Sequence, residues 1–207
     1  GTNLPNGVIT HFYLPTYDAA KDSVALSFHE ADGTLIKRYC TTDKKQALEV
    51  KAGGNQFVWN MRYEGAERLQ GMILWSASLQ GAKAVPGEYV VKLSVNGNEQ
   101  SQRVNIIPSP LAEVGVTEMQ AQFDFVNTNN QTIDKAHKAI KKIRAVNKKL
   151  KEFQANFKDD EATNALRLQA KDLAKALSSV EKALYQTQNR SNQDPLNFPI
   201  RLTNKLG

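Results

Sequence analysis

The spacing of apolar residues along this chain changes once, at Pro108 and Pro110. Before these prolines, apolar residues recur at every second position in short runs, as they do on half-buried β-strands. After them, the spacing becomes three and four, which is typical of helices. Because proline lacks a backbone N–H and fixes φ, the pair ends the last strand. The sequence therefore predicts an α+β chain of two domains, with an all-β part over residues 1–108 and a helical part after it.

The first 108 residues contain short apolar runs that are separated by turn residues. These runs cover residues 11–14, 23–29, 34–40, 47–50, 57–61, 72–77, 89–95 and 102–107. The dipeptides Asp32-Gly33 and Asn96-Gly97 are typical of tight hairpin turns. Short strands with turns every 8 to 12 residues or so indicate an immunoglobulin-like sandwich. Trp59 and Trp75 both lie in such runs, and we expect both in the core.

Two apolar stripes with helical spacing follow in residues 109–190. The first runs from Met119 to Phe157 and keeps its phase across the polar segment 127–132, which predicts one long helix. Thr117 and Gln120 have the spacing of a capping box at its start. The second stripe consists of Leu166, Leu173, Leu177, Val180 and Leu184. Because both stripes are narrow, we expect an antiparallel two-helix hairpin with its loop around Asp159.

Residues 191–207 form the last predicted segment. Pro195 and Pro199 disfavour a helix before Leu202 and favour an extended path. Apolar residues occupy every second position, at Leu196, Phe198, Ile200 and Leu202. We therefore expect an extended tail that docks back through one apolar side, followed by a short helix up to Leu206.

The positive charge of the chain belongs to its second half. Residues 1–108 carry 11 Lys and Arg against 10 Asp and Glu, whereas residues 109–207 carry 16 against 11. The run from Lys135 to Lys158 contains eight lysines and one arginine, with no aromatic residue on its polar side. This composition indicates a solvated helix face rather than a nucleic-acid site. The sequence contains no apolar stretch long enough for a membrane-spanning helix, so we expect no membrane span.

The cysteine and histidine content predicts no catalytic residue, cofactor site or metal site. Cys40 is the only cysteine, so no intrachain disulfide forms, and we expect a small buried hydrophobic side chain. The spacing of His11, His29 and His137 suggests no catalytic dyad. His137 falls in the helical seam, where we expect a buried, hydrogen-bonded side chain rather than a metal ligand.

Several motifs together resemble known families. The segment from Val24 to Val95, with Phe57-x-Trp59-Asn60 and Pro86-Gly87-Glu88-Tyr89, resembles the FlgD-type immunoglobulin-like domain. A longer set of motifs resembles the C-terminal region of secreted bacterial proteins that begin with a sortilin-like BNR-repeat β-propeller and are often labelled glycosyl hydrolases. These motifs are WNMRYEGA at 59–66, GMILW at 71–75 and QDPLNFPIRL at 193–202.

The resemblance implies a non-catalytic accessory or scaffolding module, located outside the cytoplasm, either in the periplasm or secreted. Its implied partner is the N-terminal propeller of the same parent protein, because this chain has no Asp-box of the Ser-x-Asp-x-Gly-x-Thr-Trp type. Glu64 stands where the family commonly has proline. We expect the chain to be a fragment of a longer protein and to form a homodimer through its helices.

Two alternative functions remain open from the sequence. The first is a carbohydrate-binding sandwich, in which Arg62, Tyr63 and Glu64 are the residues expected to face a ligand. An aromatic platform of Trp59, Tyr63, Trp75 and Tyr89 is conceivable, but such residues favour a core position. The second alternative is a hydrolase that uses its own carboxylates. Glycoside hydrolysis requires a facing pair, and Glu64, Glu67 and Glu88 belong to no motif that pairs them.

Overall fold

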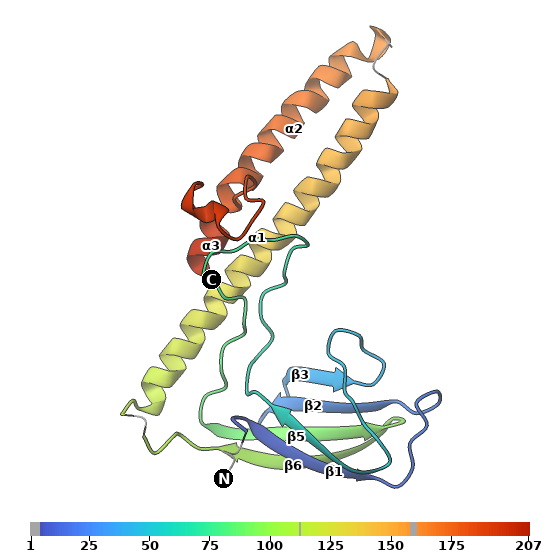
Figure 1. Ribbon diagram of the computed structural model, residues 1–207, viewed down its shortest axis with the longest axis vertical. Helices are drawn as coiled ribbons and strands as arrows, with labels where there is room; N and C mark the ends of the chain where they lie inside the picture. The colour runs from blue at the N-terminus through green and yellow to red at the C-terminus, as the bar shows by residue number, and fades with distance from the viewer. Residues whose placement is uncertain (1–4, 112, 158–160) are drawn as a thin grey trace. The chain divides into compact units, whose positions relative to one another are not determined.

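The computed structural model describes residues 5–111, 113–157 and 161–207. In these ranges an all-β part precedes an all-helical part, which confirms the α+β class (Figure 1). The strands are β1 (Val8–Leu14), β2 (Val24–Glu30), β3 (Leu35–Cys40), β4 (Gly53–Trp59), β5 (Gly87–Val95) and β6 (Asn98–Ile106). Within the described ranges, no helix is both long and apolar enough to span a membrane.

The strands form two antiparallel sheets. One sheet pairs β1 with β4, and the other has the order β3-β2-β5-β6. The predicted hairpins are confirmed: Gly33 has a φ of 91° between β2 and β3, and Asn96 and Gly97 have φ of 51° and 86° between β5 and β6. Two consecutive positive φ angles match the right-handed twist of the flanking strands, which explains the Asn-Gly pair.

The core of the β part is built around Trp59. This residue is fully buried, and its ring stacks on Phe28 with centroids 4.6 Å apart. Leu26 from β2 and Tyr89 from β5 belong to the same buried cluster, while Leu14 joins it from the two-stranded sheet. Side chains from both sheets therefore share one core, which confirms the expected position of Trp59.

Two predicted strands do not form. Ala47 makes only a single parallel bridge to Cys40, although Leu48 beside it is buried. Residues 72–77 contain no strand, and Ser76 has a φ of 55°, which an extended strand does not allow. The expectation that Trp75 is a core residue is wrong, because 41% of its surface is exposed.

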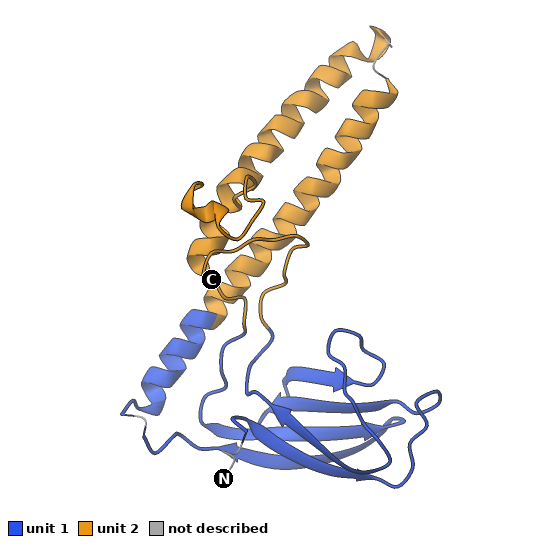
Figure 2. Cartoon of the chain, viewed as in Figure 1, with its two compact units in different colours: residues 1–64, 81–126 blue, residues 65–80, 127–207 orange. Residues whose placement is uncertain are grey.

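Residues 72–77 form no strand because the whole segment 65–80 packs with the helices instead of the sheets. Leu69 and Met72 are buried in a cluster with Ile140 and Tyr185. The chain accordingly divides into two compact units that are discontinuous in sequence, whereas the sequence suggested contiguous segments (Figure 2). Unit 1 comprises residues 1–64 and 81–126, and unit 2 comprises residues 65–80 and 127–207.

The first helix, α1 (Val116–Asn156), confirms the predicted single long helix. It continues through the polar segment 127–132, where Asn130 is buried and donates from its amide to the Gln80 carbonyl at 2.9 Å. A tertiary hydrogen bond thus compensates for poor local helix propensity.

The expected capping box at the start of α1 is not formed. The helix begins at Val116, so Thr117 lies inside the first turn. The Gln120 side chain donates to the Asp124 carboxylate at 2.9 Å, one turn further along, instead of reaching back toward the helix start. This i, i+4 contact replaces the capping interaction.

The second helix, α2 (Asn164–Leu184), follows a short 3-10 turn, η1 (Glu161–Thr163). Arg144 contacts Glu181 at 2.7 Å, and Asn147 contacts Ser178 at 3.3 Å. A step of three residues forward on α1 is therefore a step of three residues back on α2, which confirms an antiparallel hairpin. Its predicted loop around Asp159 lies outside the described residues.

The last segment docks differently from the prediction. It begins with a 3-10 turn, η2 (Asp194–Leu196), and ends with the short helix α3 (Leu202–Leu206) that was expected. Proline is tolerated in the first turn of a helix, which explains why Pro195 does not impose an extended path. Leu196 is exposed, and the buried anchor is the polar Thr203, whose hydroxyl donates to the Leu184 carbonyl at 3.1 Å.

Candidate functional site

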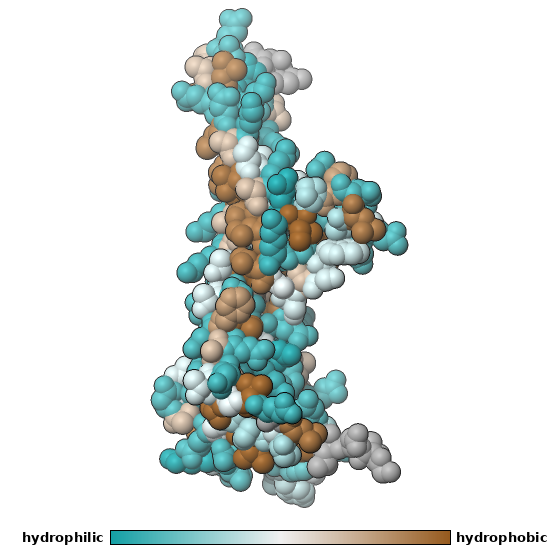
Figure 3. Space-filling model, turned by 90° about the vertical axis from the view of Figure 1, so that its left-hand side faces the viewer, coloured by the Kyte–Doolittle hydropathy of each residue, from teal (hydrophilic) through white to brown (hydrophobic). Residues whose placement is uncertain are grey.

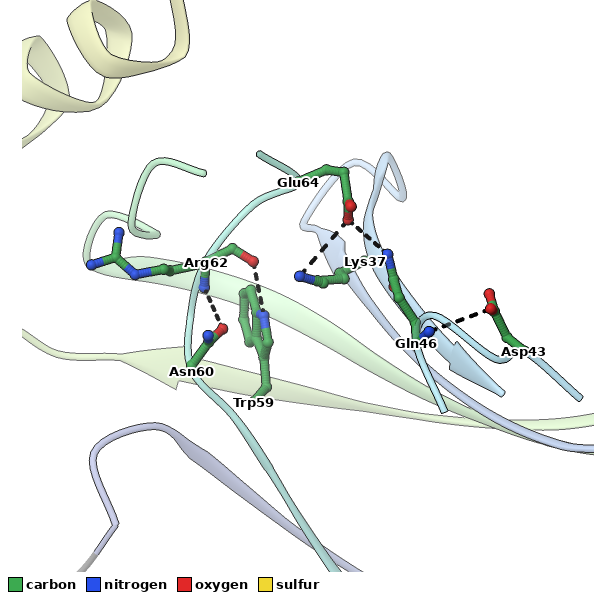
Figure 4. Close-up of polar contacts among 7 residues, drawn as sticks. All are labelled: Lys37, Asp43, Gln46, Trp59, Asn60, Arg62 and Glu64. Atoms are coloured by element: carbon green, nitrogen blue, oxygen red, sulfur yellow. Dashed lines mark hydrogen bonds and ion pairs between the residues drawn. The ribbon is translucent and has the colours of Figure 1, made fainter. Parts of the chain in front are cut away.

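The residues expected to face a ligand follow the buried end of β4. The Trp59 indole N–H donates to the Arg62 carbonyl at 3.2 Å, and the Asn60 side chain accepts from the Arg62 N–H at 3.2 Å (Figure 4). Met61 between them has a φ of 58°. These contacts fold the chain into a tight turn, so the core tryptophan directly positions residues 60–62.

The chain that leaves the sandwich at residues 61–63 runs beside the chain that returns at residues 82–84. The Tyr63 N–H donates to the Ala82 carbonyl at 2.9 Å, and the Ala84 N–H donates to the Met61 carbonyl at 2.6 Å. Gly81 lies so close to Tyr63 that an added Cβ would collide with the Tyr63 carbonyl. Only glycine allows this approach of the two backbones.

Arg62 and Tyr63 are used inside unit 1. The Arg62 guanidinium donates to the Gly81 carbonyl at 2.9 Å, which ties the outgoing chain to the returning chain. The Tyr63 hydroxyl donates to the Glu30 carboxylate, and its ring packs edge to face on Phe123 with centroids 4.7 Å apart. Burial, followed by the hydrogen bond to Glu30, raises the pKa of Tyr63 above its ordinary value.

Glu64 is the most accessible member of the three, with 62% of its side chain exposed. Its carboxylate accepts a hydrogen bond from the Gln46 amide at 2.9 Å and lies 3.8 Å from the Lys37 ammonium (Figure 4). Gln46 is itself held by its backbone N–H, which donates to Asp43 at 3.3 Å. Lys37 is mostly buried but Glu64 is exposed, so solvent around the carboxylate screens this ion pair and its contribution to stability is small.

The other candidate carboxylates also contact basic groups. Glu88 lies 3.1 Å from Arg103, and Glu67 pairs with Lys141. Glu64 likewise contacts a lysine and an amide, so each of these contacts joins a carboxylate to a basic or amide group. Two facing carboxylates are the requirement for glycoside hydrolysis, and these contacts do not supply one.

The cysteine and the helical histidine are buried, as expected. The Cys40 thiol lies 3.2 Å from the Thr42 hydroxyl. Burial acts to raise the pKa of the Cys40 thiol, but hydrogen bonds with Thr42 and Ser23 outweigh it and leave that pKa below its ordinary value. The described residues contain no group of three or more His, Cys, Asp and Glu side chains arranged to hold a metal ion.

His137 lies in unit 2 and packs against the segment that leaves the sandwich. Its side chain is fully buried, and its Nδ1 makes a 2.5 Å hydrogen bond with the Glu67 carbonyl. Burial lowers the pKa of His137, although the Glu67 carbonyl and the nearby Asp134 act in the opposite direction. The neutral imidazole therefore acts as a structural link between α1 and residues 65–80.

The basic run on α1 is partly neutralised by its surroundings. Lys138 pairs with Asp134, Lys141 with Glu67, and Arg144 with Glu181 at 2.7 Å. Lys148 lies 3.9 Å from Glu152, and Lys158 lies outside the described residues. These pairs are what a solvated helix face is expected to form.

Tyr13 is a highly exposed aromatic residue of unit 1 that sequence reasoning did not select. Tyr13 lies at the end of β1, and 70% of its surface is exposed. It lines an open depression of about 940 Å³ beside the two-stranded sheet, together with side chains from β4 and from residues 49–51. Tyr13, His11 and Ile9 alternate on the outer face of β1, so the period-two pattern was the signal that could have identified it.

Comparisons of this chain with protein-family models, curated proteins and solved structures found no match.

Proposed function

We propose that this chain is a non-catalytic accessory module that scaffolds a larger secreted protein or mediates its contacts. The observation that supports this most directly is the use of Arg62 and Tyr63. Both side chains bind groups of unit 1 itself, the Gly81 carbonyl and the Glu30 carboxylate. Side chains that are committed to holding a turn are poorly placed to bind and release a substrate.

The carboxylates support the same proposal. A glycosidase needs an acid and a second carboxylate roughly 5 to 10 Å apart on either side of the bond that it cleaves. Glu64 instead contacts Lys37 and Gln46, and Glu88 contacts Arg103. Each of these two acids thus has a cationic or amide partner.

The immunoglobulin-like identity of the sandwich and the propeller partner belong to this proposal. Two antiparallel sheets around a shared core with a buried tryptophan fit an immunoglobulin-like arrangement. The FlgD-type and BNR-propeller resemblance rests on the motifs around Trp59, Gly71 and Asp194. From this resemblance, we infer a location outside the cytoplasm and a propeller domain upstream of this chain as its natural partner.

Two experiments test the proposal. Reading the coding sequence upstream of Gly1 should reveal repeated Asp-boxes, and the purified propeller should then co-elute with this chain in size-exclusion chromatography. The chain alone should not hydrolyse aryl glycosides. Turnover that disappears in Glu64→Gln or Glu88→Gln, but persists in Glu99→Gln as a matched surface control, would contradict the non-catalytic assignment. An upstream sequence without Asp-boxes would contradict the propeller partner.

A second candidate function is carbohydrate binding, and the depression beside Tyr13 favours it. This depression lies beside the β1-β4 sheet, and its lining includes Tyr13, His11 and Gln56. The residues first expected to face a ligand, Arg62, Tyr63 and Glu64, do not line it.

A further inference from the structure

The depression beside Tyr13 is formed where a glycine faces an aromatic residue. Tyr13 is paired with Gly54 across the antiparallel β1-β4 ladder. An added Cβ at Gly54 would have no heavy atom within 4 Å, so the space above this backbone is open. The side chain of Tyr13 therefore stands beside an empty floor instead of packing on a cross-strand neighbour.

Asn55 holds residues 49–51, which also line the depression, in place. The Asn55 carboxamide accepts a hydrogen bond from the Lys51 N–H at 2.9 Å and donates to the Lys51 carbonyl at 2.8 Å. It also donates to the Gly53 carbonyl at 3.0 Å. Residues 49–51 are thereby fastened to the start of β4, and the depression keeps its shape without a ligand.

The polar groups around the depression are available for new hydrogen bonds. The described contacts of Gln56 use its Oε1, which pairs with His11 Nε2 at 3.2 Å, and leave its Nε2 as a donor. The side chains of Glu49 and Lys51 are exposed, and neither makes a hydrogen bond or ion pair with another described residue. The rim thus offers a carboxylate acceptor and two N–H donors, with one negative and one positive charge.

This combination matches the chemistry of a neutral sugar ring. One face of a pyranose carries C–H groups that pack on an aromatic plane, while its edges carry hydroxyl groups that need both donors and acceptors. Small-molecule sites usually have volumes of roughly 300 to 1,000 Å³, a range that includes this depression. A phosphorylated ligand would favour an excess of cationic groups, but Glu49 balances Lys51 here.

We propose that the depression between Tyr13, Gln56 and residues 49–51 is a binding site for a sugar unit of a neutral polysaccharide. Tyr13 supplies the stacking plane, and Glu49, Lys51 and Gln56 bind hydroxyl groups. Because the depression is open to solvent, a glycan chain can enter and leave on either side, so an internal sugar unit is accommodated. The site does not depend on the propeller partner, and it functions in the isolated chain.

Affinity electrophoresis of the full chain tests this proposal with four soluble polysaccharides: hydroxyethyl cellulose, xylan, galactomannan and amylopectin. At least one should retard the chain. Tyr13→Ala should weaken that interaction by about tenfold or more, whereas Tyr13→Phe keeps the ring and should retain most of it. Phe125→Ala removes an exposed aromatic ring elsewhere in unit 1 and serves as the matched control.

A second variant tests the location without changing the ring. Gly54→Leu places a side chain on the open floor and should abolish retardation, while its thermal unfolding curve should stay close to that of the parent chain. Retardation by none of the four polysaccharides would overturn the proposal. So would binding only to acidic polygalacturonate, or retardation that Tyr13→Ala and Gly54→Leu leave unchanged. None of these results depends on whether a propeller precedes the chain.

Discussion

Trp59 and Trp75 lie in similar apolar runs, yet their surroundings are opposite. Trp59 is fully buried against Phe28 and donates its indole N–H to a carbonyl. Trp75 is partly exposed, and its backbone N–H and carbonyl are both bound by the Asn204 side chain, at 2.6 and 2.8 Å. Trp59 therefore stabilises the fold mainly through burial of its ring, whereas Trp75 does so mainly through its backbone hydrogen bonds.

This contrast predicts different effects of truncation. Trp59→Ala should lower the free energy of unfolding by about 3 to 5 kcal/mol, because it removes a large side chain from the centre of the core. Trp75→Ala should cost about 1 kcal/mol or less, because it leaves the backbone contacts intact. Urea denaturation followed by circular dichroism measures both, and equal losses for the two variants would contradict this difference.

His137 makes the stability of unit 2 dependent on pH. Burial lowers its pKa in the folded chain, so the unfolded chain binds a proton more readily. The free energy of unfolding should therefore decrease as pH falls from about 6.5, the pKa of histidine in the unfolded chain, toward the lower pKa of His137 in the folded chain. Above about pH 6.5, His137 should contribute no further pH dependence.

Urea unfolding of unit 2 at several pH values between roughly 5 and 8 checks this prediction. His137→Gln should be less stable at neutral pH but should show a smaller loss on acidification. An unchanged slope in His137→Gln would show that another group is responsible.

At the scale of elements, the paired backbones at residues 61–63 and 82–84 mark where the chain leaves and re-enters the sandwich. Gly81→Ala should destabilise unit 1 by about 1 to 3 kcal/mol, because the new methyl group would force the two backbones apart. Gly54→Ala is the matched control, since its methyl group meets no atom within 4 Å. Comparable losses in the two variants would contradict the steric explanation.

The two hairpins that formed as predicted have a turn signal between their strands. The hairpins at Gly33 and Gly97 require positive φ, and the residues at these turns specify it. Residues 72–77 have an equally apolar pattern, but no tight turn joins them to a neighbouring strand. Their apolar residues meet the helices through Met72, a contact between distant parts of the sequence that periodicity cannot reveal.

At the scale of the whole molecule, the helices leave apolar surface uncovered. Leu166, Leu173 and Val180 recur every seven residues on α2, and each is about half exposed. Brown side chains also gather along the helical part of the surface in Figure 3. Apolar residues that are left half exposed along a helix in this way commonly mark contact sites.

We therefore predict that the chain forms a homodimer through its helices. Sedimentation velocity at increasing concentration should show a monomer–dimer equilibrium, because a second copy can cover the α2 stripe. Leu173→Lys should shift it toward the monomer, whereas Ser179→Lys, which adds the same charge at an exposed polar position of α2, should not. A monomer at every concentration would contradict the prediction.

The candidate site illustrates the limits of sequence reasoning about function. Arg62, Tyr63 and Glu64 drew attention because charged and aromatic residues cluster beside a tryptophan. Their exposure depends on whether Gly81 and Glu30 lie within reach, and these groups are distant in sequence. Tyr13 had no neighbouring motif, and its exposure follows from the glycine opposite to it in the ladder.

The sequence by itself determined the α+β class, the two tight hairpins and the long helix α1, because periodicity and turn residues act over a few neighbouring positions. The tertiary structure decided what residues 65–80 pack against, which tryptophan is buried and which aromatic ring remains exposed. These outcomes depend on contacts such as Met72 with Tyr185 and Tyr63 with Glu30. Such contacts join residues that only the folded chain brings together, so no local pattern encodes them.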